Sequence, residues 1–342
     1  MAVNAISNIN AEMFSTELCR LTFATDGESS VLAVRRGADE IFRCEYFPDT
    51  AGRVTVYDLD RLLEPYIPDG FADFSFVADG VPLGPGTVRV FRSSARVSEP
   101  AESFLRSFFL TACGGERDTA PGRFETLTAY CAKAEPVTVE RTFRPASGGI
   151  AVAVTESVVE AGWRELDVSP DRFADASAGT LVAYSVRVGN RVARYRVNRE
   201  LPAADPALVF RNCFHAWETV SLTGTKETTP TFARSQAMVG GRMRSYRVEE
   251  TVEHKALTGP LRPSMVPVID DLCRSREVFL LNADGSPGDE VAVTDCDLKR
   301  TNEDAAPVVL SVTYRLAERL NAPVKAPRPP RIFDSSFDRK FN

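Results

Sequence analysis

Residues 181–198 read Leu-Val-Ala-Tyr-Ser-Val-Arg-Val-Gly-Asn-Arg-Val-Ala-Arg-Tyr-Arg-Val-Asn, two β-prone runs separated by Gly189-Asn190. Glycine followed by asparagine between such runs predicts a two-residue hairpin turn of the type II′ kind. The predicted cross-strand pairs are Val188 with Arg191, Val186 with Ala193, Tyr184 with Tyr195 and Val182 with Val197. One face of this hairpin is apolar, whereas the other carries mainly serine and arginine and faces water. Turn chemistry and strand pattern agree, which predicts an antiparallel β-hairpin.

The same alternation of short apolar runs and turn residues continues on both sides of this hairpin. Turn signals recur about every ten residues, a spacing typical of β-sandwiches and β-barrels, and 342 residues exceed one ordinary core. We therefore expect a mainly β protein with two β-sandwich or β-barrel-like units, a few short helices and an extended C-terminal arm. The expected divisions are an N-terminal β unit at 1–95, a connecting region at 96–145, a C-terminal β-barrel-like unit at 146–320 with a short helix near 264–273, and a Pro-rich basic arm at 321–342.

Composition limits the classes of function. Lys and Arg number 41 against 47 Asp and Glu, and the resulting net charge of −6 argues against a protein whose main task is to grip nucleic acid. No stretch approaches the ~20 consecutive apolar residues that a membrane helix needs. The N-terminus shows neither the basic nor the apolar region of a signal peptide. We expect no nucleic-acid partner and no membrane partner, and a protein that is made in the cytoplasm and kept there or released without a signal.

Residue types that carry common chemistries are sparse in this chain. The seven cysteines include no CxxC pair, and the two histidines, His215 and His254, exclude a His-rich metal centre. Neither a GxxxxGK[ST] nor a GxGxxG phosphate loop occurs. The cysteines are expected to be buried free thiols in a reducing compartment. We therefore expect no enzyme activity, no cofactor and no bound metal.

Two local patterns leave narrower alternatives open. Cys213 and His215 would share a face of an extended strand, as a thiol nucleophile and its base would need to. A catalytic pair is usually assembled from distant segments, so a packed or interface histidine is the favoured interpretation. The acidic stretch 282–290 superficially resembles a calcium loop, but it lacks the ligand spacing of an EF-hand. Its Asp-Gly and Pro-Gly pairs favour a hairpin turn.

Several segments spread over most of residues 20–320 share a pattern with one group of proteins. They are 57–60, 62–66, 209–224, 240–250, 258–261, 275–280, 293–304 and Tyr314-Arg315. Together they resemble uncharacterised proteins encoded in tail modules of Bacteroidetes phages and prophages. The resemblance implies a virion structural protein: a tail or baseplate component of distal-tail type that forms a homo-oligomeric ring and contacts other tail proteins. It also implies assembly in the host cytoplasm and a location in the virion tail.

An alternative from a different class is a carbohydrate-binding or host-adhesion module. Exposed aromatic rings that stack on sugars would carry such a function, and Trp163 and Trp217 are the candidates. The partner would then be a surface glycan in place of other tail proteins.

Residues 321–342 hold a separate candidate for partner binding. Five basic residues and a Pro-rich stretch predict an extended arm that stays away from its own core. Phe333, Phe337 and Phe341 follow at a spacing of four residues, which places them along one side of a short helix. We expect these phenylalanines to contact an adjacent subunit. The alternative is a disordered tail, because terminal segments usually fray.

Overall fold

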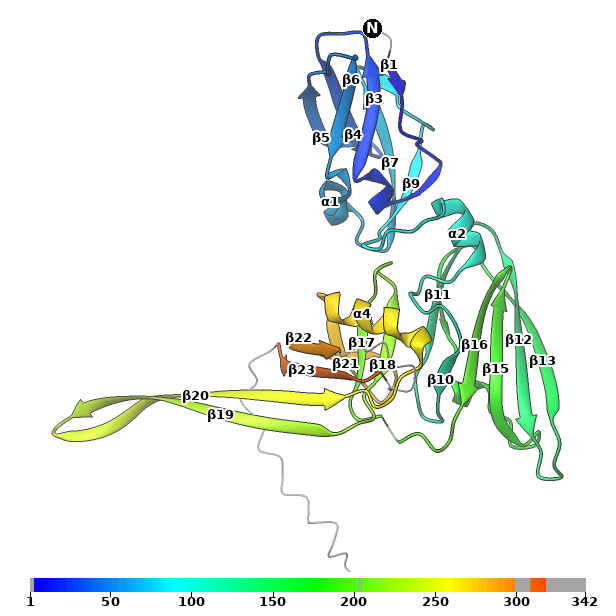
Figure 1. Cartoon of the computed structure of the whole chain (residues 1–342), viewed down its shortest axis with the longest axis vertical. Coiled ribbons are helices and arrows are strands. Elements are labelled where there is room, and N and C mark those ends of the chain that lie inside the picture. The colour runs from blue at the N-terminus through cyan, green and yellow to red at the C-terminus, as the bar shows by residue number, and fades with distance from the viewer. Residues whose placement is uncertain (1–2, 203, 299–307, 318–342) are drawn as a thin grey trace, which may run out of the picture.

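The computed structural model describes residues 3–202, 204–298 and 308–317, and strands dominate its secondary structure. The prediction of a mainly β protein with a few short helices is confirmed. Figure 1 shows the strands gathered into three units, which we call the N-terminal, middle and C-terminal units. Each unit has a hydrophobic cluster of its own. The arm expected at 321–342, with Phe333, Phe337 and Phe341, lies outside the described residues.

The N-terminal unit is a sandwich of two sheets that share one core. Its elements are β1 (Val3–Ala5), β2 (Glu12–Phe14), β3 (Arg20–Thr25), β4 (Ser30–Arg36), β5 (Asp39–Tyr46), β6 (Arg53–Tyr57), α1 (Leu59–Leu63), β7 (Phe71–Ala78), β8 (Val81–Pro82) and β9 (Val88–Phe91). The strand orders are β1-β3-β6 and β2-β9-β7-β4-β5, with β8 beside β7. Strand β7 shows why the sandwich forms: every second residue is buried, so one face of the strand enters the core.

The middle unit is built around the predicted hairpin. Its elements are α2 (Ala101–Ser107), β10 (Arg117–Thr119), β11 (Thr126–Cys131), β12 (Glu135–Arg144), β13 (Ala151–Val159), β14 (Gly162–Asp167), α3 (Pro170–Phe173), β15 (Thr180–Val188) and β16 (Arg191–Val197). The larger sheet has the order β10-β16-β15-β12-β13, and β11 pairs with β14. The register of β15 and β16 confirms three predicted pairs and ends at Ala183 opposite Arg196, one residue short of the fourth. Gly189 has a φ of 56°, and the turn residue Asn190 is not among the residues with positive φ, as a type II′ turn requires.

The expected division of the chain needs a correction. Residues 96–145 are not a connecting region, because β10 pairs with β16 and β12 pairs with both β13 and β15. The polar stretch 114–122 predicts a loop within this connection, because charged residues are usually exposed. Arg117 and Thr119 are nevertheless buried, since carboxylates from other segments pair with the arginine. The expected unit at 146–320 in turn spans parts of both the middle and the C-terminal unit.

The C-terminal unit is one seven-stranded sheet with a helix packed on it. Its elements are β17 (Ala207–Arg211), β18 (Trp217–Ser221), β19 (Lys226–Val239), β20 (Arg242–Leu257), α4 (Val266–Arg274), β21 (Val278–Leu281), β22 (Pro287–Leu298) and β23 (Leu310–Leu316). The strand order is β18-β17-β21-β22-β23-β20-β19. The helix expected near 264–273 corresponds to a short 3-10 turn followed by α4, whose Val268, Ile269 and Leu272 enter the core.

Strands β19 and β20 continue far beyond this sheet as a two-stranded arm (Figure 1). β20 pairs with β23 only at residues 254–257, so its outer part has β19 as its one neighbour among the described strands. We call residues 228–252 the hairpin arm and residues 231–248 the arm tip. Gly240-Gly241 forms the turn, and both glycines have positive φ. Among the described residues, no helix is both long enough and apolar enough to cross a membrane.

Candidate functional site

The three units meet at an aromatic cluster to which each contributes. Phe14 comes from the N-terminal unit, Phe104 from α2 and Phe214 from the turn between β17 and β18. The ring centroids lie 5.5 Å apart for Phe14 and Phe104, 5.6 Å for Phe14 and Phe214, and 5.2 Å for Phe104 and Phe214. Aromatic contacts at such distances stabilise an interface beyond the area they bury. This junction therefore fixes the turn that holds Cys213 and His215.

Cys213 and His215 lie in this turn and not on an extended strand, so the shared face considered from the sequence does not exist. The side chain of Asn212 shapes the turn, because its Oδ1 accepts hydrogen bonds from the backbone N–H groups of Phe214 and Ala216, each at 3.0 Å. His215 has a φ of 60°, a left-handed conformation that few residues other than glycine and asparagine adopt. The geometry is that of a packed turn.

The electrostatics of the turn do not favour a thiolate. Burial raises the pKa of the Cys213 thiol, and the nearby Asp271 carboxylate raises it further. Burial lowers the pKa of His215, as do Arg92 and Arg211. The Nε2 atom of His215 lies 3.0 Å from the carbonyl oxygen of Pro68. A neutral thiol beside a neutral imidazole is suited to packing and hydrogen bonding.

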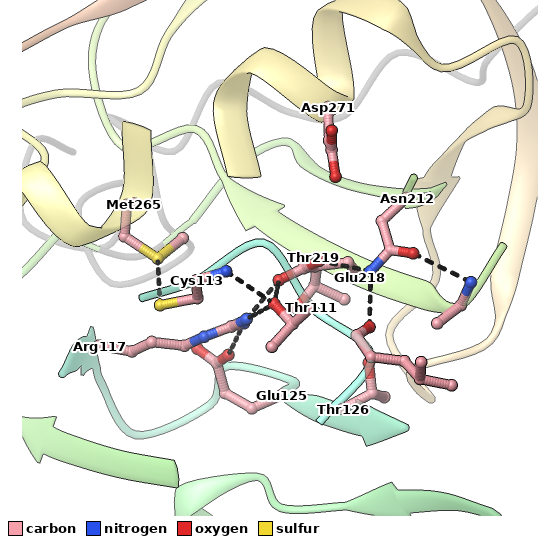
Figure 2. Close-up of polar contacts among 12 residues, drawn as sticks. Thr111, Cys113, Arg117, Glu125, Thr126, Asn212, Glu218, Thr219, Met265 and Asp271 are labelled. Carbon is pink, nitrogen blue, oxygen red and sulfur yellow. Dashed lines mark hydrogen bonds and ion pairs between the residues drawn. The ribbon is translucent and has the colours of Figure 1, made fainter. Parts of the chain in front are cut away.

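A buried polar network lies behind the turn (Figure 2). Arg117 donates to Glu218 and, at 2.6 Å, to the hydroxyl of Thr111, which itself donates to Glu218 at 2.6 Å. Asn212 donates to the other oxygen of Glu218 at 2.8 Å. Burial is the largest single influence and opposes the charge on Arg117, but Glu218 and the neighbouring Tyr195, Cys113 and Glu125 together hold the pKa of the arginine well above its ordinary value. Because all of these groups have partners, the network rigidly joins the middle and C-terminal units.

A cleft of about 410 Å³ lies on the other side of the turn, between the N-terminal and C-terminal units. Five arginines and three carboxylates line it: Arg61, Arg92, Arg211, Arg274 and Arg276, with Asp60, Glu64 and Glu277. Arg92 donates to Glu64 at 2.7 Å. Arg61, Arg274 and Arg276 form no ion pair with another described residue. This excess of guanidinium groups suits the cleft to an anionic group.

The two tryptophans considered for sugar stacking are half-buried and already contact protein groups. Trp163 stacks on Phe71 with ring centroids 6.4 Å apart. The guanidinium of Arg211 lies 3.7 Å from the ring centroid of Trp217. Each indole therefore packs within the fold on at least one side.

The hairpin arm is a long exposed surface of the described residues. All but two of the 14 residues of β19 are exposed, as are the first seven of β20. Met238 lies directly opposite Met243, Arg234 opposite Val248 and Phe232 opposite Glu250. Side chains alternate along a strand, so these residues share one face. Phe232, Met238, Met243 and Val248 are each more than half exposed, and we call them the apolar stripe.

The sequence indicated only part of this surface. Gly240-Gly241, followed by a mixture of Arg and Glu residues, predicts a turn that leads into one long strand with a solvated face or a charged interface. The apolar stripe was missed because its members lie on two strands that have to be paired first. The alternation from Phe232 to Met238 is the signal that would have shown it.

The remaining expectations concern metals and thiols. No group of three or more His, Cys, Asp or Glu side chains that could hold a metal ion occurs among the described residues. In the stretch 282–290, Asp284 accepts hydrogen bonds from the hydroxyl and backbone N–H of Ser286, as in a polar turn. Of the seven cysteines only Cys131 and Cys213 are buried, so the expectation of buried thiols is wrong for the other five.

No family model and no curated protein matches this chain. Among solved structures, the calcium-binding domain CBD12 of CALX1.1 aligns with 58% of this chain and 100% of its own, at 11% identity and a TM-score of 0.20. A second solved structure comes from a 1.5-MDa bacterial ice-binding adhesin and concerns the retention of that adhesin at the host cell surface. It aligns with 75% of this chain and 91% of its own, at 11% identity and a TM-score of 0.17. Scores this low establish no shared fold.

Proposed function

We propose that this chain is a structural subunit of a phage tail or baseplate, of distal-tail type, that assembles with copies of itself and contacts other tail proteins. Its role would be mechanical, with no catalytic step and no cofactor. The location in the virion tail and the ring-like assembly come from the resemblance of its sequence segments to tail-module proteins. The hairpin arm is the structural observation that supports a role in assembly.

The arm supports this proposal because it is too exposed to be stable by itself. A two-stranded hairpin without further cover is marginally stable in water. The apolar stripe also leaves Phe232, Met238 and Met243 in solvent on one face of the arm, although burial of large apolar side chains is favourable. Open strand edges likewise invite pairing with another chain. A second protein surface that covers the arm would stabilise the hairpin, bury its apolar side chains and pair its open strand edges.

The test is the mass of the chain in solution as a function of concentration. Replacing residues 232–250 by Asn-Gly joins Thr231 to Thr251, which lie opposite each other, through a two-residue turn. We expect the full chain to self-associate by light scattering coupled to size exclusion, and the shortened chain to remain a monomer with an unchanged melting temperature. A full chain that stays monomeric from micromolar to millimolar concentration would refute the assembly role.

The arginine-lined cleft favours a second candidate function, the binding of an acidic surface glycan. Arg274 and Arg276 are exposed and form no ion pair with another described residue, so they are free to bind a carboxylate. A glycan array with sialylated and neutral sugars would test this. Binding that is confined to acidic glycans and lost in Arg274→Gln/Arg276→Gln would support it, and an array without signal would remove it.

A further inference from the structure

Strand β13 is an exposed sheet edge with an unusual composition. It stands at the end of the five-stranded sheet and pairs with β12 on one side. Val152, Val154 and Val158 project from the same face of β13, and Ile150 precedes them with the same alternation. Their exposed fractions are 58%, 56%, 71% and 75% in that order. A long edge strand with β-branched residues in water is the kind of surface that pairs with another chain.

Strand β13 lacks three of the usual protections of an edge strand, namely lysine, proline and a β-bulge. Its sequence, AVAVTESVV, contains no lysine and no proline, and its pairing with β12 shows no register shift. Proteins commonly blunt an edge by one of these means. By contrast β19, at the edge of the seven-stranded sheet, contains Pro230. The edge of β13 therefore has the features of a strand that is covered in the assembled state.

The carboxylates nearest to β13 are opposite in charge to the arm tip, whereas the exposed arginines of the same sheet face, Arg187, Arg194 and Arg196, lie on β15 and β16, away from this edge. Glu140, next to Val154 in the register, and Glu156 are exposed on the outer face, and neither forms an ion pair with another described residue. The arm tip, residues 231–248, carries four arginines and no Asp or Glu. Both surfaces also present a row of apolar side chains. The two surfaces are therefore complementary in charge and in apolar character.

The two surfaces lie at opposite ends of the molecule, with β13 at the outer edge of the middle unit and the arm pointing away from it (Figure 1). We infer that the arm tip of one copy docks on the edge strand β13 of a second copy, adding its strands to the five-stranded sheet. This inference rests on the proposed assembly role. A contact between two different surfaces is heterologous, and repetition of such a contact produces a ring if it closes. A pair of copies joined by one such contact retains one unoccupied arm and one unoccupied edge strand.

The experiment uses two variants of the full chain that each disable one surface. The edge variant is Val152→Lys/Val154→Lys, which adds positive charge opposite the arginines of the arm. The arm variant is Phe232→Ser/Met238→Ser/Met243→Ser. All of these positions are exposed, so circular dichroism should show unchanged folding. Phe47→Lys, in the N-terminal unit and 77% exposed, is the matched control for loss of an exposed apolar side chain.

We expect each variant alone to be monomeric, with dissociation constants at least tenfold above those of the wild type and of Phe47→Lys. An equimolar mixture should form a 1:1 dimer and nothing larger, because one intact arm and one intact edge remain. If the edge variant assembles like the wild type and the arm variant does not, the inference about β13 is overturned but the assembly role of the arm stands. A wild-type chain that never self-associates would overturn the assembly role itself.

Discussion

The guanidinium of Arg191 donates a hydrogen bond of 2.6 Å to the carboxylate of Glu135, and the arginine is 1% exposed. Two more of its nitrogens donate to the carbonyl oxygens of Leu105 and Tyr130, at 2.7 Å and 2.6 Å. Arg191 follows the turn of the central hairpin and points into the middle unit. It thereby joins the hairpin to α2 and to the end of β11.

Arg191→Met should destabilise the protein by about 3–5 kcal/mol, because it leaves Glu135 and two carbonyl oxygens without their donor. Arg191→Lys should recover only part of this loss, since one ammonium group cannot reach three acceptors in the same geometry. Urea denaturation measures the free energy of unfolding of both variants. The matched control is Arg187→Met on the exposed face of the same hairpin, which we expect to change stability by less than about 0.5 kcal/mol. Equal effects of Arg191→Met and Arg187→Met would contradict the assignment.

Gly189→Ala should destabilise the chain by about 1 kcal/mol or more. The φ of 56° at this turn position is strained for any residue with a Cβ atom, and the added methyl would crowd the Glu135 carboxylate. Gly86→Ala is the control, because its φ is not in the left-handed range and nothing lies within 4 Å of the added carbon. The difference in urea midpoint between the two variants gives the result. A tolerated Gly189→Ala would argue against the type II′ turn.

The sequence predicted the central hairpin because that information is local: the turn residues and the alternation lie within 18 residues of each other. It failed where burial depends on distant partners. Arg191 and Glu135 are 56 residues apart, and Arg117 and Glu218 are 101 apart. An arginine without its carboxylate predicts an exposed position, so the region around Arg117 was assigned to a connection. The apolar stripe could not be predicted for a related reason: the pairing of the two strands has to be known before its members can be placed on one face.

Arg117→Met should destabilise the protein by about 3–5 kcal/mol, because Glu218 is then buried without its cation. The double variant Arg117→Met/Glu218→Met should be more stable than the single one, since it removes the uncompensated charge. Thermal and urea denaturation of the single variants Arg117→Met and Glu218→Met and of the double variant, each against the wild type, measures this order. If the double variant loses the sum of both single effects, the two residues do not act as a pair.

Stability should fall as the pH is lowered from 7.5 to 6.0, and His215 should account for part of the loss. Its pKa in the folded protein lies below the ordinary value of 6.5, because of burial first and Arg92 and Arg211 next. Between these two pKa values the unfolded chain binds a proton that the folded chain does not, so unfolding becomes easier as the pH falls. His215→Asn, which tolerates the left-handed φ, should flatten the pH dependence of the urea midpoint.

His254 is a second histidine that contributes to this pH dependence. Its pKa is also lowered, by burial and by Lys226, so His254→Gln should remove a separate share of the same slope. The urea midpoint of the double variant His215→Asn/His254→Gln should then depend less on pH than that of either single variant over this range. If the wild type and His215→Asn have the same pH dependence, the imidazole of His215 is not held neutral by its surroundings.

The arm should be the fastest-exchanging strand pair of the monomer in hydrogen-exchange measurements. Its tip, residues 231–248, is two-stranded with nearly all side chains exposed, whereas Ala256 at the base is 1% exposed and pairs with β23. Amides of marginal hairpins open without global unfolding, so those of the tip should exchange within the dead time and those of residues 254–257 near the global limit. At concentrations where the chain self-associates, exchange in the tip should slow, while Thr22–Thr25 in the N-terminal unit keeps its rate. A tip that is already protected in dilute monomer would show that the arm is stable without a partner.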